Sequence, residues 1–300
     1  MAIQQLGVLY FDLCGRLDRS RLASCAGQGR QGSALHISAR RITEDGGDVN
    51  IETFVDSARR WLGIWPADIM DLHECGACKQ AMAAEGRDDG PGERAAHLAA
   101  CSSANREEAG LRGALTTYHT GHTALRTAVR LCAEDALGKD CVREEVPGLI
   151  RGSQERPGDV VLYPPGLSVA VDTTITHIQT ATNMKLQADN PGKPVLDDER
   201  GKYNKYANAE FTSTTRFVPF AVDDFGHIGD SGWALLEQLA AYAAARRSGK
   251  ESEAYVRTTL LQKWQHRIAH AVRTVVHRSV QDRLIASRRH LTERRLAAVI

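Results

Sequence analysis

The sequence predicts an α/β fold in which a mixed β-sheet is flanked by helices. Three observations lead to this class. Residues 159–172 have the pattern of a β-hairpin, residues 197–222 have that of a helix followed by a strand, and residues 230–285 have that of two long helices. A hairpin gives antiparallel strands, whereas a strand reached through a crossover helix is parallel to its neighbour. The sheet is therefore expected to be mixed.

The N-terminal part is expected to contain a lead-in and a helical region. Residues 1–30 are rich in Gly, Ser and Arg after one apolar run, which predicts a poorly fixed lead-in or the broken end of a longer polyprotein. Residues 31–115 follow as the helical region, in which residues 48–66 carry apolar side chains at helical spacing. Residues 85–92 are rich in Gly and Asp and predict a loop insertion.

Four potential zinc ligands lie in this helical region. Cys75 and Cys78 are separated by two residues in a short turn, and His97 and Cys101 are four apart, so that one helical face would present both. Four nitrogen and sulfur ligands from a turn and a helix match a closed structural Zn²⁺ site. Two alternatives stay open: His73 replaces one ligand, or the cysteines are ordinary buried thiols.

The next helix is predicted at about residues 120–137. It places His122 and Arg126 four residues apart, on one side. Its other side is apolar and is expected to face the core, through Leu125, Val129, Cys132 and Ala136. His122 is a candidate contact to DNA or phosphate, and simple capping or packing is its alternative role.

Asp159 and Asp172 are the most informative pair in the chain. Between them, two short β-branched and aromatic runs flank a Pro/Gly turn, which predicts a hairpin. Pairing Tyr163 with Ser168 brings the two aspartates directly opposite each other, with their Cβ atoms about 5 Å apart. The same register gathers an all-apolar set on the other face, namely Val160, Leu162, Val169 and Val171. Two adjacent carboxylates repel unless a cation lies between them, and a hard ion such as Mg²⁺ or Mn²⁺ suits them.

A charged helix over residues 197–206 is predicted to cross from the hairpin to the next strand. Glu199, Lys202 and Lys205 recur every third residue and share one side of this helix. Ligands of such sheets collect at strand ends, so one of the two lysines is expected to reach the aspartates. Gly201 counts against this helix, because glycine in a helix interior is less favourable than alanine by about 1 kcal/mol.

The last predicted elements are a strand at residues 216–222 and helices at residues 230–247 and 252–285. The second helix carries an apolar stripe that is expected to face the core, consisting of Val256, Leu260, Trp264, Ile268, Val272, Val275 and Val276. Residues 246–300 hold thirteen Lys/Arg against four Asp/Glu, a local excess of nine positive charges. This excess suits a phosphate backbone or, alternatively, a solvated helix face.

The composition describes a chain that can bury a sizeable core. Its 300 residues are 42% hydrophobic, and the net charge of +1 gives no overall basic signature. No apolar run is long enough to cross a membrane, and the first residues do not resemble a signal peptide. Seven cysteines, an odd number, favour reduced thiols. We therefore expect an intracellular protein of one or two domains.

The order of these motifs resembles one family. The Pro-x-Asp at residues 157–159, the second acidic residue at Asp172 and the Lys-x-x-Lys-Tyr at residues 202–206 are similar to the PD-(D/E)xK restriction-like endonuclease domain of R2-type non-LTR retrotransposon proteins. The cysteine and histidine set resembles their CCHC zinc motif. Residues 122–126 resemble their Arg-His-Asn/Asp motif, and residues 217–226 resemble the stretch that closes the domain.

Several residues depart from the family pattern. Gly158 separates the proline from its aspartate, and Thr174 stands where a D-x-K nuclease carries its lysine. The retrotransposon branch resembles this chain in lacking that lysine, and it uses one from the following helix instead. Gly121 and Thr123 stand where the family has an arginine and an asparagine. Either this copy has diverged or its DNA contacts differ.

The resemblance implies a restriction-endonuclease-like domain over residues 116–300, preceded by a small zinc-knuckle region. Asp159 and Asp172 would hold Mg²⁺ or Mn²⁺, and either Lys202 or Lys205 would be the catalytic lysine. The zinc ion would be structural.

The activity implied is metal-dependent nicking of target DNA, which primes reverse transcription in the nucleus. Besides the DNA, partners would be the element RNA and a reverse-transcriptase region of the same polyprotein. The resemblance assigns DNA contacts to His122, Arg126, Arg156 and Tyr206.

Two other functions stay open. Gly121, Thr123 and Thr174 suit an inactive or domesticated remnant that only binds nucleic acid. The lack of a polymerase segment suits a cellular repair or resolvase-type nuclease of the same fold. The sequence specifies no target site, strand preference or oligomeric state.

Overall fold

The computed structural model describes residues 117–247, apart from Ser213, and residues 252–297. Nearer the N-terminus it describes isolated residues and short pairs, namely Ile69, Leu72, Glu74, Cys75, Ala83–Ala84, Arg87–Asp88, Arg94–Ala95 and His97–Leu98. The predicted lead-in at residues 1–30 and the predicted helix at residues 48–66 lie outside the described residues.

One expectation for the N-terminal part is corrected. The short strands β1 (Ala83–Ala84) and β2 (Arg87–Asp88) pair antiparallel, so the stretch predicted as a plain loop insertion contains a strand. Two residues per strand are too few to produce an alternating pattern, so no strand could be predicted there.

The centre of the fold is a four-stranded mixed sheet in the order β3-β4-β5-β6. β3 pairs antiparallel with β4, β4 pairs antiparallel with β5, and β5 pairs parallel with β6. The bounds are β3 (Val142–Glu144), β4 (Val160–Leu162), β5 (Ser168–Thr176) and β6 (Thr215–Asp223). The predicted α/β class with a mixed sheet is confirmed, and β3 is an additional strand at one edge.

The predicted hairpin register is also confirmed. Val160 pairs with Val171 and Leu162 with Val169, and the side chain of Asp159, directly before β4, lies near that of Asp172. The backbone N–H of Asp159 donates at 2.8 Å to the carbonyl of Val171, the partner of Val160, so the ladder is offset by one residue at Asp159.

Gly158 makes this register possible. A Cβ atom at residue 158 would lie 2.8 Å from the backbone nitrogen of Val171 and 3.1 Å from the carbonyl carbon of Ala170. Real Cβ atoms do not approach a backbone so closely, so only glycine fits here. The residue that separates Pro157 from Asp159 is therefore a steric requirement of the hairpin.

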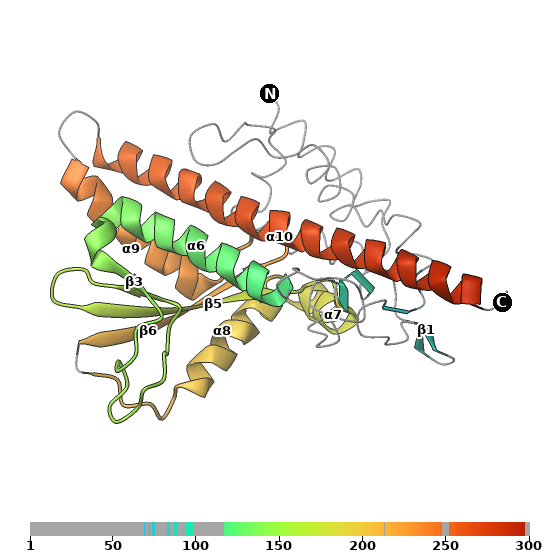
Figure 1. Ribbon diagram of the computed structural model, residues 1–300. Helices are drawn as coiled ribbons and strands as arrows, with labels where there is room; N and C mark the ends of the chain where they lie inside the picture. Colours follow the sequence, from blue (N-terminus) through green and yellow to red (C-terminus); the bar gives the residue numbers. More distant parts are fainter. Residues whose placement is uncertain are drawn as a thin grey trace.

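Apolar side chains cover both faces of the sheet. The four residues predicted to share one face of the hairpin belong to the large cluster formed with α6, α9 and α10. On the opposite face, Val161 and Ala170 belong to a smaller cluster with Tyr206 and Phe217. Figure 1 shows α8 on the side of the sheet opposite α6 and α10. The sheet is therefore the middle layer of three.

Three helices form the layer on the large core. They are α6 (Thr117–Leu137), α9 (Asp230–Arg247) and α10 (Glu253–Ala297). Their predicted counterparts end within a few residues of these bounds, except that α10 continues to Ala297. All seven residues of the predicted apolar stripe of α10 are buried.

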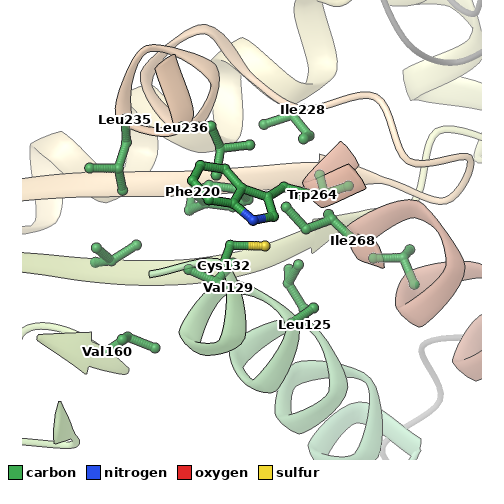
Figure 2. Packing of buried hydrophobic residues seen from close by; sticks show 14 of the residues in the cluster. Leu125, Val129, Cys132, Val160, Phe220, Ile228, Leu235, Leu236, Trp264 and Ile268 are labelled. Atoms are coloured by element: carbon green, nitrogen blue, oxygen red, sulfur yellow. The ribbon is translucent and has the colours of Figure 1, made fainter. Parts of the chain in front are cut away.

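Trp264 of α10 ties these helices to the sheet. Its side chain is fully buried, and Figure 2 shows it close to Phe220 of β6 and Cys132 of α6. The indole N–H donates to Asp135 Oδ2 at 3.1 Å, and the guanidinium of Arg267 donates to the same oxygen at 3.2 Å. Truncation of a buried tryptophan typically costs about 3–5 kcal/mol, so α10 is a structural part of the domain.

Part of the C-terminal positive charge has a structural role. Arg246 donates to the carbonyls of Ala136 and Leu137 at 3.5 and 3.3 Å, and Arg247 donates to the carbonyl of Asp135 at 2.6 Å. These carbonyls belong to the last turn of α6, where basic side chains satisfy groups without a partner in the helix. These two arginines therefore fasten α9 to α6.

The connection from β5 to β6 contains two helices, whereas the sequence predicted one. α7 (Ala181–Asp189) begins after Thr180, whose hydroxyl accepts from the N–H of Asn183 at 3.2 Å. α8 (Lys193–Lys205) follows and begins before the predicted start at Asp197. α7 is missed because it is short and polar and has no clear apolar period. The parallel pairing expected from a crossover is confirmed.

No helix within the described ranges combines the length and apolar composition needed to cross a membrane.

Two glycine substitutions test this fold in opposite directions. A Cβ atom at Gly201, in the exposed middle of α8, would meet no heavy atom within 4 Å. We expect Gly201→Ala to raise the free energy of unfolding by about 0.5–1 kcal/mol. Gly158→Ala is expected to lower it by roughly 1–3 kcal/mol because the strands must move apart. Chemical denaturation measures both changes, and a Gly158→Ala protein as stable as the parent would contradict the register.

Candidate metal centre

Four polar side chains from four parts of the chain converge beside the hairpin. His122 lies in the first turns of α6, Asp159 directly precedes β4, Asp172 lies in β5 and Lys202 lies near the end of α8. One ligand atom each from His122, Asp159 and Asp172 lie within 4.8 Å of one another. The sequence predicts the two aspartates here but assigns His122 to DNA contact, whereas the structure places His122 against the aspartates.

Asp159 accepts several hydrogen bonds at one oxygen. Its Oδ2 lies 3.0 Å from His122 Nε2 and accepts from the backbone N–H and the hydroxyl of Thr173 at 2.6 and 2.7 Å. The Thr173 hydroxyl also lies 3.5 Å from His122 Nε2. Thr173 is not among the predicted site residues. Successive side chains of a strand point to opposite faces, so the predicted pairing of Asp159 with Asp172 contained no signal for Thr173.

Asp172 pairs with Lys202. The Lys202 ammonium donates to Asp172 Oδ1 at 2.9 Å, and only 10% of the Asp172 side chain is exposed. The ammonium of Lys205 instead lies over the Tyr206 ring, 4.7 Å from its centroid. The structure therefore distinguishes the two lysines that the sequence left equivalent, because only Lys202 bonds to the aspartate.

Burial and neighbouring charges act differently on the titratable groups. Burial raises the pKa of Asp172, Lys202 opposes this rise, and the charge of Asp159 adds to it. Burial also acts upward on the pKa of Asp159, but hydrogen bonds from His122 and Thr173 bring that pKa below its usual value. The hydrogen bond to Asp159 raises the pKa of His122. A second carboxylate charge is thus disfavoured here, and a divalent cation would relieve that repulsion.

Glu199 fixes the position of α8. Its carboxylate is buried and accepts from the backbone N–H groups of Ser231 and Gly232 at 3.1 and 3.2 Å. These groups belong to the first turn of α9, where N–H groups have no partner in the helix. Burial raises the pKa of Glu199 even so. The sequence contains no signal for this contact; in the structure, a Cβ atom at Gly229 would lie 2.3 Å from Glu199 Oε1.

A second contact fixes the same helix against β5. The Thr176 hydroxyl donates to Asp198 Oδ2 at 2.6 Å. Asp198 contacts Thr176, and Lys202, one turn later on α8, contacts Asp172, which comes earlier on β5. The two elements therefore run in opposite directions, as a crossover requires.

The other residues that were predicted to contact DNA lie outside this cluster. Arg126 forms an ion pair with Glu145 and lies 3.6 Å from Glu144. Arg156 donates to Glu145 at 2.7 Å and is 58% exposed. Tyr206 is buried in the smaller cluster. Of these three, only Arg156 presents its side chain at the surface.

Gly121 has a steric reason to depart from the family's arginine. A Cβ atom at residue 121 would lie 3.2 Å from Val275 Cγ1 and 3.4 Å from Ile175 Cδ1. Glycine therefore lets α6 lie close to both α10 and β5, and an arginine would require these neighbours to shift. Thr174 stands two residues after Asp172, and the ammonium group beside that aspartate comes from Lys202 instead.

The predicted zinc site is only partly within the described residues. Cys78 and Cys101 lie outside them. Cys75 is buried in the large cluster, and His97 is helical, as predicted for its segment. The zinc site therefore stays a prediction.

Comparison of the chain with protein-family models, curated proteins and solved structures gives no match. The family resemblance consequently rests on the sequence motifs alone.

The His122–Asp159 pair predicts a pH dependence of stability in the absence of metal. The folded-state pKa of His122 lies above the ordinary value of 6.5, so the pair's contribution is fully present below pH 6.5 and is lost as the pH rises through the raised pKa. We expect His122→Asn to lower the free energy of unfolding by roughly 0.5–1 kcal/mol at pH 6, and by less at pH 9. Urea denaturation in EDTA measures this difference. In an Asp159→Asn background the pH dependence of the His122→Asn effect should disappear, and its persistence would reject the pairing.

Proposed function

We propose that the chain is a metal-dependent DNA endonuclease that nicks target DNA for an R2-type non-LTR retrotransposon. The observation that carries this proposal is the meeting of Asp159, Asp172 and Lys202 at one point. The motif resemblance assigns the metal to the two aspartates and the catalytic ammonium to Lys202 or Lys205. Asp159, Asp172 and Lys202 come from three separate parts of the chain. The mixed sheet flanked by helices is compatible with a restriction-endonuclease-like fold.

The residues of the cluster fit a divalent cation. Two carboxylates and an imidazole offer ligand atoms within 4.8 Å of one another, and oxygen-rich sets of this kind hold Mg²⁺ or Mn²⁺. A bound ion would lower the pKa of a water molecule and polarise the scissile phosphate. Asp159 and Asp172 would hold it, and the register of the β4–β5 hairpin sets their spacing.

Lys202 would orient the attacking water or stabilise the extra negative charge of the transition state. Its ammonium lies 2.9 Å from Asp172 Oδ1, so it stands beside the carboxylate that would hold the ion. Fixed cations next to a reacting phosphate stabilise the charge that develops there. Thr176 and the α9 N-terminus hold the helix that carries Lys202, so the ammonium is positioned before substrate binds.

In this proposal the target DNA is the substrate, and the element RNA and a reverse-transcriptase region of the same polyprotein are partners in the nucleus. The predicted zinc motif and the exposed Arg156 would contribute to DNA engagement. Nicking would supply the 3′ end that primes reverse transcription.

Nicking of supercoiled plasmid tests the aspartates. We expect cleavage by the purified chain with Mn²⁺ or Mg²⁺ and none in EDTA. Asp159→Asn and Asp172→Asn are each expected to lower the nicking rate by about 100-fold or more, because each removes charge from the metal ligands. Asp197→Asn is the matched control, since Asp197 pairs with Lys193 on α8 and is not part of the cluster.

Two outcomes would reject this assignment. Nicking that persists in Asp172→Asn would exclude Asp172 as a metal ligand of the reaction. A folded protein that binds DNA but does not nick it with any divalent ion would favour the nucleic-acid-binding remnant. An upstream reverse-transcriptase reading frame in the flanking genomic sequence distinguishes the retrotransposon from a cellular repair nuclease.

A pair of lysine substitutions tests the choice of catalytic lysine. We expect Lys202→Met to lower the nicking rate by about 100-fold, because it removes the ammonium at Asp172. Lys205→Met should change the rate by less than about 3-fold, since its ammonium rests on the Tyr206 ring. Single-turnover rates with saturating Mn²⁺ measure both effects. An equal loss in the two variants would mean that the geometry has not singled out the catalytic lysine.

A further inference from the structure

His122 occupies a position that a DNA contact does not require. Its Nε2 lies 3.0 Å from Asp159 Oδ2, and its side chain is only 27% exposed. The nitrogen thus faces the carboxylate pair, whereas a residue that binds the DNA backbone would present its donor at the surface. Because Gly121 has no Cβ atom, the start of α6 can lie close to β5. This close approach brings the imidazole to the aspartates.

The spacing of the three side chains suits one shared ion. Two ligands at about 2.1 Å from an ion are separated by about 3 Å when adjacent and by up to about 4.2 Å when opposite. The ligand atoms of His122, Asp159 and Asp172 lie within 4.8 Å of one another, so movements of a few tenths of an ångström bring all three into range. Nε2 can either bond to Asp159 through a proton or coordinate an ion, so the ion would replace that hydrogen bond.

We propose that His122 is the third protein ligand of this centre and that it makes the centre selective for Mn²⁺ over Mg²⁺. Mg²⁺ prefers oxygen ligands, whereas transition metals accept imidazole nitrogen, and Mn²⁺ also accepts carboxylates readily. One imidazole with two carboxylates combines these preferences. The inference rests on the proposed function for the use of the ion, but ligand identity is measured on the protein without DNA.

Binding of Mn²⁺ alone to the metal-free, full-length chain tests the ligand directly. We expect pulsed electron paramagnetic resonance of the bound Mn²⁺ to show modulation from a coordinated imidazole nitrogen. The modulation should be lost in His122→Gln. His177→Gln is the matched control, because His177 also forms a close pair with an aspartate, with its Nδ1 2.7 Å from Asp224 Oδ1, and is not part of the cluster. It should keep the signal.

Titration calorimetry measures the selectivity for Mn²⁺ over Mg²⁺. We expect the wild-type chain to bind Mn²⁺ at least 10-fold more tightly than Mg²⁺, and His122→Gln to lose about 10-fold or more in Mn²⁺ affinity with less than about 3-fold change for Mg²⁺. Absence of nitrogen modulation in wild-type protein with bound Mn²⁺ would overturn the proposal, and that measurement does not depend on whether any variant folds. Equal losses for both ions would also overturn it.

The result separates this inference from the nuclease. Nitrogen coordination in a chain that never nicks DNA would support His122 as a ligand and reject the endonuclease. Nicking by a chain whose Mn²⁺ shows oxygen ligands only would support the endonuclease and reject His122 as a ligand.

Discussion

The buried carboxylate of Glu199 is the contact on which the geometry of the site depends. It satisfies the N-terminal N–H groups of α9 and so joins α8, on one side of the sheet, to a helix of the large core. Residue 229 is glycine because nothing larger leaves room for this carboxylate. Lys202 follows Glu199 by about one turn on α8. The contact that anchors the helix therefore also sets where the Lys202 ammonium lies relative to Asp172.

In the cluster, stabilising contacts compensate the cost of placing two carboxylates side by side. Two carboxylates lie close together in a partly buried place, and each loses hydration there. Thr173 and His122 compensate Asp159, while Lys202 compensates Asp172. A cation can replace the hydrogen bonds that the side-chain nitrogens of His122 and Lys202 donate, because the ion supplies the same compensation from between the carboxylates. The folded chain can thus hold the site together before an ion arrives, and the site remains open to one.

Local patterns were sufficient to predict the hairpin, its register and the parallel crossover. The Pro/Gly turn and the alternation on each side determine which residues face each other, and both signals lie within residues 159–172. The choice between Lys202 and Lys205 was out of reach, since both share one helix face and only tertiary contacts separate them. The contact of His122 with Asp159 could not be predicted either, because the two residues are distant in sequence and no periodicity links a helix to a hairpin.

The departures from the family motifs acquire physical reasons once the packing is known. Gly158 and Gly121 both stand where a Cβ atom would press against neighbouring atoms, at the hairpin backbone and between α6 and its neighbours. Thr174 need not be lysine, because Lys202 brings an ammonium group to Asp172 from α8. These substitutions fit an intact cluster and give no independent argument for an inactive remnant. Gly121 also allows the close approach that carries His122, which resembles the histidine of that motif, to the aspartates. The departure from the motif at residue 121 and the position of the imidazole at the carboxylate pair therefore follow from the same packing.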